Sequence, residues 1–204
     1  MFFSFDGVDG AGKTTQLKDF CQWLAELGHD VVTCRDPGST ELGEAIRKIL
    51  LDRESVPIHL RSEMLLYMAA RAQLVHEVIE PALRGGRTLV ADRFLLANVV
   101  YQGYAGGLDV ESLWQVGHVA TGRVEPAMTF LLDISAEDAA ARIGRSPDRM
   151  EQRGRKFLSR VREGYLQEAA GRKDQIVVID ASRPVDQVQA DIRAAATGLL
   201  ACDR

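Results

Sequence analysis

The segment from residue 7 to residue 14 combines the residue types that bind phosphate groups. It reads Gly7-Val8-Asp9-Gly10-Ala11-Gly12-Lys13-Thr14 and matches the pattern G-x-x-x-x-G-K-[ST]. Glycines let a backbone curl so that successive N–H groups point at phosphate oxygens, and the positive end of a following helix faces the same anion. Lys13 is expected to reach the β- and γ-phosphates of a nucleotide, and the Thr14 hydroxyl to hold Mg²⁺.

The alternative for this phosphate loop is a chance glycine-rich turn before a helix. Here an apolar run, residues 2–6, precedes the pattern, and residues 13–27 follow it with the apolar spacing of an amphipathic helix. That strand–loop–helix context favours phosphate binding. A guanine-reading switch would carry Asn-Lys-x-Asp, but the one asparagine, Asn98, is followed by Val99, which argues against such a switch.

A second set of candidate residues, Asp92-Arg93-Phe94, follows the apolar run 88–92. Ligands of open parallel sheets bind beyond the carboxyl ends of the strands. At that edge a carboxylate can hold the water shell of Mg²⁺, and an adjacent arginine can bind a second phosphate. The alternative is an exposed ion pair after a strand, because Asp-Arg is a common dipeptide.

Arginines dominate the stretch 144–154, where the apolar pattern of the helices disappears, and we expect this stretch to form a mobile lid. The phosphate loop has no arginine of its own, so the donors that stabilise a transferred phosphoryl group must come from elsewhere. Arg145 and Arg149 are the candidates. Arg142, just before the lid, is expected to stack on adenine. Other arginines at the lid fit a solvated charged face equally well: Arg153 and Arg155.

Short apolar runs without alternation, separated by helical patterns, predict a parallel sheet that is covered on both faces. The predicted strands are residues 2–6, 30–34, 88–92, 128–133 and 176–180. The predicted helices are residues 13–27, 41–51, 62–83 with Ser62 as cap, 96–104, 109–121, 135–144, 155–170 and 185–200. This order predicts a three-layer α/β/α P-loop fold with a five-stranded parallel sheet. No linker divides the chain, so we expect one domain over residues 1–204.

The composition is that of an ordinary globular chain. Hydrophobic residues make up 46% and charged residues 26% of the 204 residues. The net charge is -4, so the chain as a whole does not attract nucleic acid or anionic membranes. Three cysteines at no metal-ligand spacing fit a reducing compartment. Neither a signal peptide nor a membrane span is indicated. We therefore expect a cytoplasmic protein with small-molecule partners and neither nucleic acid nor membrane as a partner.

Four further motifs stand in order after the phosphate loop: Arg35-Asp36-Pro37-Gly38, Tyr67-Met68-Ala69-Ala70-Arg71, Asp92-Arg93-Phe94 and Asp148-Arg149-Met150-Glu151. With the segment 5–15, they make the chain from residue 1 to about residue 195 resemble the thymidylate kinase family. The ordered set is specific, although each motif alone is not. The resemblance implies a homodimeric, Mg²⁺-dependent enzyme that converts ATP and dTMP to ADP and dTDP.

The resemblance also implies a role for each matching position. It gives as catalytic residues Lys13, Arg93, Arg145 and Arg149, and as metal-binding residues Thr14 and Asp92. The implied ATP-binding residues are Gly7, Val8, Asp9, Gly10, Ala11, Gly12, Lys13, Thr14, Thr15 and Arg142. The implied dTMP-binding residues are Asp9, Asp36, Tyr67, Arg71, Arg93, Asn98 and Tyr101. Arg93 would hold the acceptor phosphate, Asp9 would lie near the 3′-hydroxyl, and Tyr101 would crowd the 2′ carbon. Where the family often has serine this chain has Ala97, which removes one possible polar contact.

Tyr67 and Arg71 are four residues apart in a helical pattern, so their side chains share a face. The ring can cover a base while the guanidinium donates to its edge. Arginine can only donate, and the amide of Asn98 can accept the base N3–H, so the set suits thymine or uracil rather than cytosine. The alternative is that both side chains pack the helix, with Arg71 paired to a carboxylate.

Other functions stay open at this point: a kinase of another nucleoside monophosphate such as UMP or CMP, a deoxynucleoside kinase, and a nucleotide-dependent switch or ATP-sensing module. A deoxynucleoside kinase would be expected to carry Glu-Arg where this chain has Asp92-Arg93. The predicted helix 62–83 also has more apolar surface than one sheet face needs, which predicts a homodimer. Its apolar residues are Met64, Leu65, Met68, Ala72, Val75 and Ile79.

Overall fold

The computed structural model describes residues 1–51, 56–142 and 153–202. A five-stranded sheet, parallel throughout, has the strand order β2-β3-β1-β4-β5. The strands are β1 (Phe2–Asp6), β2 (Val31–Arg35), β3 (Thr88–Asp92), β4 (Met128–Asp133) and β5 (Ile176–Asp180). The predicted parallel sheet is confirmed. The second strand lies one residue later than predicted, because Val31 pairs with Thr88 and Arg35 pairs with Asp92.

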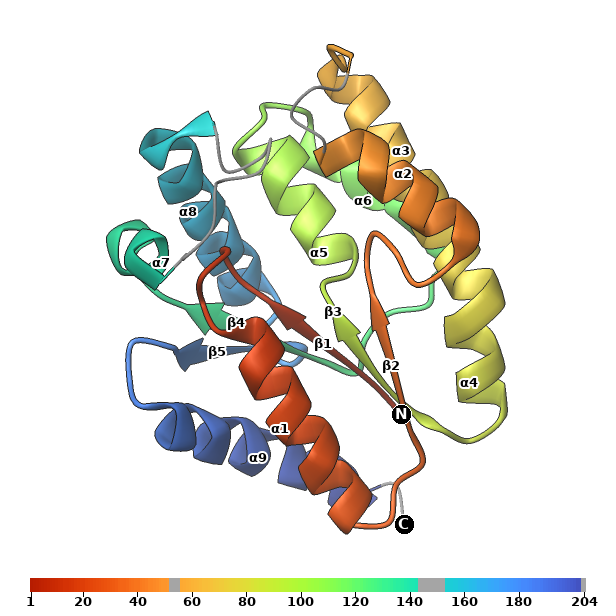
Figure 1. Ribbon diagram of the computed structural model, residues 1–204, viewed down its shortest axis with the longest axis vertical. Coiled ribbons are helices and arrows are strands. Elements are labelled where there is room, and N and C mark those ends of the chain that lie inside the picture. Colours follow the sequence, from red (N-terminus) through yellow and green to blue (C-terminus); the bar gives the residue numbers. More distant parts are fainter. Residues whose placement is uncertain (52–55, 143–152, 203–204) are drawn as a thin grey trace.

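Helices cover both faces of this sheet, so the three-layer arrangement is confirmed as well. In the described part of the chain they are α1 (Lys13–Glu26), α2 (Glu41–Leu51), α3 (Leu60–Leu74), η1 (Val75–Ile79), α4 (Glu80–Arg84), α5 (Leu95–Asn98), η2 (Val99–Tyr104), α6 (Val110–Thr121), α7 (Ala136–Arg142), α8 (Arg155–Gly171) and α9 (Val185–Cys202). Figure 1 shows α1 and α9 together on one side of the sheet, and α3, α5 and α8 on the other. All residues of the central strand β1 are therefore buried.

The single helix predicted over residues 62–83 is three successive segments. It begins earlier, at α3, because the His59 ring accepts the N–H of Arg61 at 3.3 Å and caps the helix, so Ser62 lies inside it and is not the cap. The π-helical segment η1 then leads into α4. Pro81, in the first turn of α4, has no N–H to continue an α-helical ladder, and the wider turn of η1 comes directly before it.

The helix predicted over residues 96–104 also changes type. It starts at α5 and becomes the π-helical segment η2, where the N–H of Ala105 bonds the carbonyl of Val100 at 3.0 Å. A π-helical turn rotates the side chains that follow it relative to an ideal α-helix. Asn98, Tyr101 and Gln102 come from this stretch and line one cavity.

The apolar row predicted to form a dimer surface is partly used inside the chain. Met68, Val75 and Ile79 are buried in a core cluster with residues of the sheet. Leu65, by contrast, is 54% exposed. None of the helices in the described part of the chain is both long and apolar enough to cross a membrane.

Candidate active site

The phosphate loop joins β1 to α1, and two of its glycines are required by close packing. Gly7 and Gly10 have φ values of 134° and 86°, in the region that favours glycine. A Cβ at Gly7 would lie 2.5 Å from the carbonyl oxygen of Leu132, and a Cβ at Gly10 would lie 2.2 Å from that of Ala139. The loop therefore packs against β4 and α7 too closely for any side chain at these positions.

The Lys13 side chain folds back over the phosphate loop. Its Nζ donates to the carbonyl oxygens of Gly7 at 3.0 Å and Val8 at 2.9 Å, and it lies 3.4 Å from Asp9 Oδ1. The ammonium is nearly buried, and this burial, with the nearby charge of Arg93, lowers the pKa of Lys13. These loop oxygens are structural partners of the cation, so a phosphate group that binds Nζ must replace some of them.

Arg93, directly after β3, contacts the phosphate loop from the other side. Its Nη2 donates to Asp9 Oδ1 at 2.6 Å, and its Nη1 donates to the Gly7 carbonyl at 3.0 Å and to the Tyr165 hydroxyl at 3.2 Å. Burial alone would raise the pKa of Asp9, but the attraction of Arg93 and Lys13 outweighs it and holds this pKa below its usual range. Asp9 is therefore a carboxylate shared by two cations.

Asp6, the last residue of β1, is a buried carboxyl group that the sequence did not single out. Its Oδ1 accepts from the Tyr165 hydroxyl at 3.1 Å, while its Oδ2 has no hydrogen-bond partner among the described residues. Burial raises the pKa of Asp6 to about 7, against the attraction of Arg93. Because Tyr165 also accepts from Arg93, its hydroxyl links Asp6 to the arginine that holds the loop.

A cleft of about 1030 Å³ opens over the phosphate loop. Its walls contain most residues predicted to bind ATP: Asp9, Gly10, Ala11, Gly12, Lys13, Thr14, Thr15 and Arg142. Gly7 and Val8 do not line the cleft, and their carbonyl oxygens bind side chains instead. Arg142 donates from Nη1 to the Ala181 carbonyl at 2.9 Å, which places it beside the turn 181–185 that forms another part of the wall.

A smaller pocket of about 110 Å³ adjoins the cleft and collects every residue predicted to contact dTMP: Asp9, Asp36, Tyr67, Arg71, Arg93, Asn98 and Tyr101. Two further polar lining residues, Arg47 and Gln102, were not predicted from the sequence. Arg47 of α2 lines both cavities and donates to the Pro37 carbonyl at 3.0 Å, and nothing in its helical pattern marks it. Gln102 follows Asn98 by four residues, and this spacing is the signal that could have found it.

Arg71 is 1% exposed and is held by groups from two other elements. Its Nε donates to Asp36 Oδ2 at 2.5 Å, and its Nη1 donates to Asn98 Oδ1 at 3.0 Å. Burial raises the pKa of Asp36, and the charge of Arg71 opposes that rise. Arg71 thus has the carboxylate partner that the packing alternative required, and it lines the smaller pocket at the same time.

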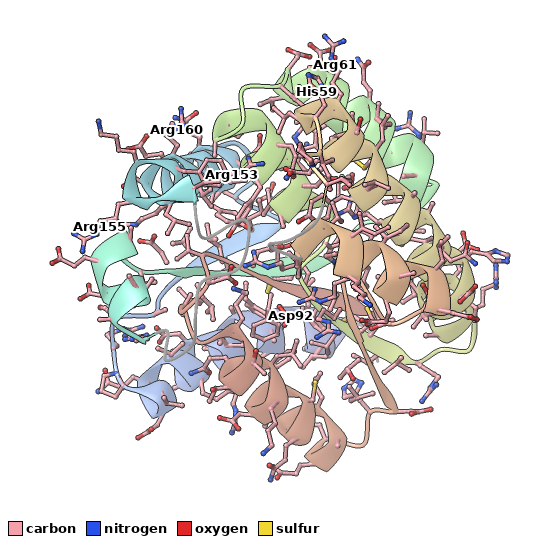
Figure 2. The ribbon with its side chains drawn as sticks, turned by 45° about the horizontal axis from the view of Figure 1, so that its top comes forward. His59, Arg61, Asp92, Arg153, Arg155 and Arg160 are labelled. Atoms are coloured by element: carbon pink, nitrogen blue, oxygen red, sulfur yellow. The ribbon has the colours of Figure 1, made fainter. Side chains whose placement is uncertain are left out.

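The predicted lid lies largely outside the described residues, and both of its candidate catalytic arginines, Arg145 and Arg149, do so. Arg155 is exposed at the start of α8. Arg153 pairs with the buried Glu63 of α3 at 2.9 Å. Figure 2 shows Arg153 on the inner side of the start of α8, with Arg155 and Arg160 toward the outside. The flanking arginines therefore differ: only Arg155 fits a solvated face.

Oxygen donors that suit Mg²⁺ line the cleft. Thr14 comes from the first turn of α1 and Asp92 from the end of β3. The backbone N–H of Asp36 bonds the Asp92 carbonyl at 3.0 Å, and Asp36 Oδ1 is buried with no partner among the described residues. Mg²⁺ takes oxygen ligands, keeps several waters and needs only one or two carboxylates beside nucleotide phosphates. The set fits a nucleotide-bound Mg²⁺. Among the described residues, no cluster of three or more His, Cys, Asp or Glu side chains could hold a metal.

Comparison with known proteins gives one consistent result. The family model described as thymidylate kinase matches residues 5–192. A thymidylate kinase of Pelotomaculum thermopropionicum is 46% identical over 205 residues, which cover 98% of this chain and 94% of that protein. One of Symbiobacterium thermophilum is 45% identical over 194 residues, with 95% and 91% covered. The crystal structure of thymidylate kinase from Ehrlichia chaffeensis superposes with a TM-score of 0.78 at 28% identity, covering 96% of this chain and 97% of that chain.

Lys13→Ala should abolish phosphoryl transfer and leave the fold intact, because the loop loses the cation that we expect to face the transferred phosphate. Loss of such a contact costs about 3–4 kcal/mol in the barrier. The measurement is kcat in a coupled ADP-release assay, with circular dichroism to verify folding. Lys18→Ala, which changes an exposed lysine of α1, is the matched control and should keep wild-type activity. A folded Lys13→Ala protein with nearly normal kcat would contradict the assignment.

Proposed function

Because this chain belongs to the thymidylate kinase family and transfers the terminal phosphate of ATP to dTMP, giving ADP and dTDP in dTTP synthesis, we propose that ATP occupies the larger cleft and dTMP the smaller pocket. One observation carries the proposal. Four residues line both cavities, where the γ-phosphate of ATP and the phosphate of dTMP would meet: Asp9, Asp36, Arg47 and Arg93. A single domain, proposed over residues 1–204, would hold both substrates.

The proposed chemistry depends on positioning and on charge. Lys13 would bind the β- and γ-phosphates of ATP, and Arg93 would bind the phosphate of dTMP, so the acceptor oxygen would approach the γ-phosphorus in line. Arg47, which lines both cavities, would add a second guanidinium on the acceptor side. Thr14 and Asp92 would hold Mg²⁺. When bound, this ion would neutralise negative charge on the phosphate groups.

The proposed reading of the base uses α3 and the α5–η2 stretch. Tyr67 would cover one face of thymine, and Arg71 would donate to the carbonyl at position 4. Asn98 Oδ1 already accepts from Arg71, and its second lone pair can accept the base N3–H. Cytosine presents an amino group at position 4 and no N3–H, so Arg71 would face a donor and Asn98 Oδ1 would lose its proton donor. Tyr101 would lie against the 2′ carbon and exclude ribose.

The test of this reading is kcat/KM for dTMP, dUMP, dCMP and UMP with wild type, Arg71→Ala and Asn98→Ala. We expect dTMP first, dUMP second, and very poor use of dCMP and UMP. In the wild type, dCMP would leave a buried donor without an acceptor, which costs about 1–3 kcal/mol. Each variant removes one of the groups that impose this cost, so both should lose activity with dTMP and much of the preference for dTMP over dCMP.

The control for this panel is Arg84→Ala, which removes an exposed arginine of α4 and should change nothing. Arg71→Ala also leaves Asp36 without its ion-pair partner, so Asn98→Ala is the cleaner of the two variants. A wild-type preference for dCMP, or an unchanged preference in both variants, would overturn the reading.

The proposed lid supplies the arginines that the phosphate loop lacks. If Arg145 and Arg149 stabilise the transferring phosphoryl group, Arg145→Ala and Arg149→Ala should lower kcat more than they raise either KM. Steady-state kinetics with both substrates varied gives the split. Arg155→Ala, at an exposed position, serves as the control. Unchanged kcat in both single variants and in the double variant would leave the lid arginines as a solvated charged face.

We further propose a cytoplasmic homodimer. The described free cysteines, Cys21 and Cys34, fit a reducing compartment. Leu65 of α3 is 54% exposed and Val119 of α6 is 84% exposed, and these two helices pack against each other. Exposed apolar side chains on neighbouring helices are typical of a surface that a partner covers.

Val119→Glu should therefore dissociate the dimer, because a charge cannot be buried unpaired in an apolar interface. Sedimentation velocity at micromolar concentration measures the effect. Leu27→Glu, at an exposed apolar position at the end of α1, should leave the dimer unchanged. A wild-type protein that sediments only as a monomer would contradict the proposal.

A further inference from the structure

Tyr165 of α8 is a buried side chain whose hydroxyl lies between a guanidinium and a carboxyl group. It accepts from Arg93 Nη1 at 3.2 Å and donates to Asp6 Oδ1 at 3.1 Å. Burial, with the nearby Asp6, raises the pKa of Tyr165 well above its ordinary value, so the hydroxyl keeps its proton. Tyr165 is not among the described residues that line the cleft or the smaller pocket. Any effect of its hydroxyl on a substrate must therefore be indirect.

The backbone of Arg93 is held by the sheet, whereas its side chain needs other contacts. Its φ is 68°, in the left-handed region that side chains rarely adopt, and its N–H donates to the Phe5 carbonyl of β1 at 2.9 Å. The arginine side chain has several rotatable bonds and a large rotamer entropy. A guanidinium that binds a phosphate in one geometry therefore needs partners that restrict these bonds.

The partners of the Arg93 guanidinium leave a defined part of it for a ligand. Nη1 donates to two acceptors, the Gly7 carbonyl and the Tyr165 hydroxyl, and Nη2 donates to Asp9. These contacts do not use the Nε–H or the second N–H of Nη2. A guanidinium can bind a phosphate through two parallel N–H groups. The Tyr165 hydroxyl thus helps to keep Nη1 on the loop and the other N–H groups available.

Asp6 anchors the Tyr165 hydroxyl on the side away from Arg93. This carboxyl group ends β1 and is fully buried, and its Oδ1 accepts from Tyr165, while its Oδ2 has no hydrogen-bond partner among the described residues. Buried polar groups are stable only when they are hydrogen-bonded, so the bond to Tyr165 matters to both residues. The hydroxyl therefore connects the end of β1, helix α8 and the residue after β3.

We propose that Tyr165, anchored by Asp6, is a positioning residue for the acceptor phosphate: its hydroxyl holds the Arg93 guanidinium in the orientation that binds the phosphate of dTMP. The inference rests on the proposed binding of that phosphate by Arg93. Tyr165 itself touches neither substrate. Its effect is specific to the phosphate, so thymidine, which has the same base and sugar without the phosphate, should bind equally well with or without the hydroxyl.

Tyr165→Phe tests the proposal, because it removes the hydroxyl and keeps the ring, which packs edge-on against Tyr101 with the centroids 6.4 Å apart. The measurement is the Kd of dTMP and of thymidine by isothermal titration calorimetry, with thermal melting to verify folding. We expect the Kd of dTMP to rise about tenfold and that of thymidine to change less than about twofold, because one hydrogen bond to a charged group is lost.

Tyr104→Phe is the matched control. Tyr104 is half-buried, and its hydroxyl donates to Glu168 of α8 at 2.9 Å, so this variant also removes a tyrosine hydroxyl that is bonded to a carboxyl group. Both Kd values should stay at their wild-type level. Asp6→Ala is a second route, because it releases the Tyr165 hydroxyl from β1. It should raise the Kd of dTMP about threefold and leave that of thymidine unchanged.

A double-mutant cycle shows whether the Tyr165 hydroxyl acts through Arg93. Arg93→Ala removes the guanidinium and should bring the Kd of dTMP close to that of thymidine. In this background Tyr165→Phe should change neither Kd further, since the group that it positions is absent. A further loss of dTMP binding in the double variant would contradict the proposal.

A purely structural Tyr165 would weaken the binding of dTMP and thymidine by the same factor. An unchanged ratio of the two Kd values in folded Tyr165→Phe protein would therefore overturn the inference, and Asp6→Ala decides in the same way if Tyr165→Phe does not fold. If Arg93→Ala lowers the preference for dTMP over thymidine but these variants do not, only the role of Tyr165 is wrong. If Arg93→Ala keeps the preference, the proposed role of Arg93 fails, and the inference fails with it.

Discussion

Asp9 Oδ1 accepts from Arg93 at 2.6 Å and lies 3.4 Å from the Lys13 ammonium, so one carboxylate separates two cations that would otherwise repel each other. The rest of the site depends on this arrangement. Lys13 follows β1 and Arg93 follows β3, and the charge between them holds both at the mouth of the same cleft. Donors that are ordered before a substrate arrives need not be reorganised during phosphoryl transfer. The glycines of the loop permit its close approach to β4 and α7. The Tyr165 hydroxyl accepts from Arg93 and donates to Asp6, so it links the arginine to the end of β1.

The smaller pocket is organised by a different interaction, a run of buried polar groups with a charge pair at each end. Arg71 and Asp36 form one pair, and Arg153 and Glu63 form the other. Buried polar groups are stable only when they are hydrogen-bonded, and a bonded chain of them leaves few orientations for each member. The amides of Asn98 and Gln102 therefore present defined donors and acceptors in this pocket.

Parallel topology brings these groups together. The carboxyl ends of β1, β3 and β2 lie side by side, so Asp6, Asp92 and Arg35 end neighbouring strands at one edge of the sheet. Residues that follow these ends in the chain form the phosphate loop, the Arg93 position and the Asp36 turn. Helical elements on one face then supply most of the smaller pocket, with Tyr101 and Gln102 coming from the π-helical segment η2. This agrees with the rule that ligands of open α/β sheets bind beyond the carboxyl ends of the strands.

The sequence by itself determined the features that are local in the chain. Glycine spacing and the apolar run before it predicted the phosphate loop, and unalternating apolar runs predicted the strands, because a strand buried on both faces needs apolar residues at every position. The family resemblance supplied the residues of the smaller pocket, which the structure brings together. Only the tertiary structure decided the pairings between distant segments. Glu63 and Arg153 are far apart in sequence. Glu63 resembles an ordinary surface residue of a helical pattern, and Arg153 resembles a solvated residue of the arginine-rich stretch. Their ion pair, like the contact of Arg47 with Pro37, joins segments that meet only in the folded chain, which no local spacing encodes.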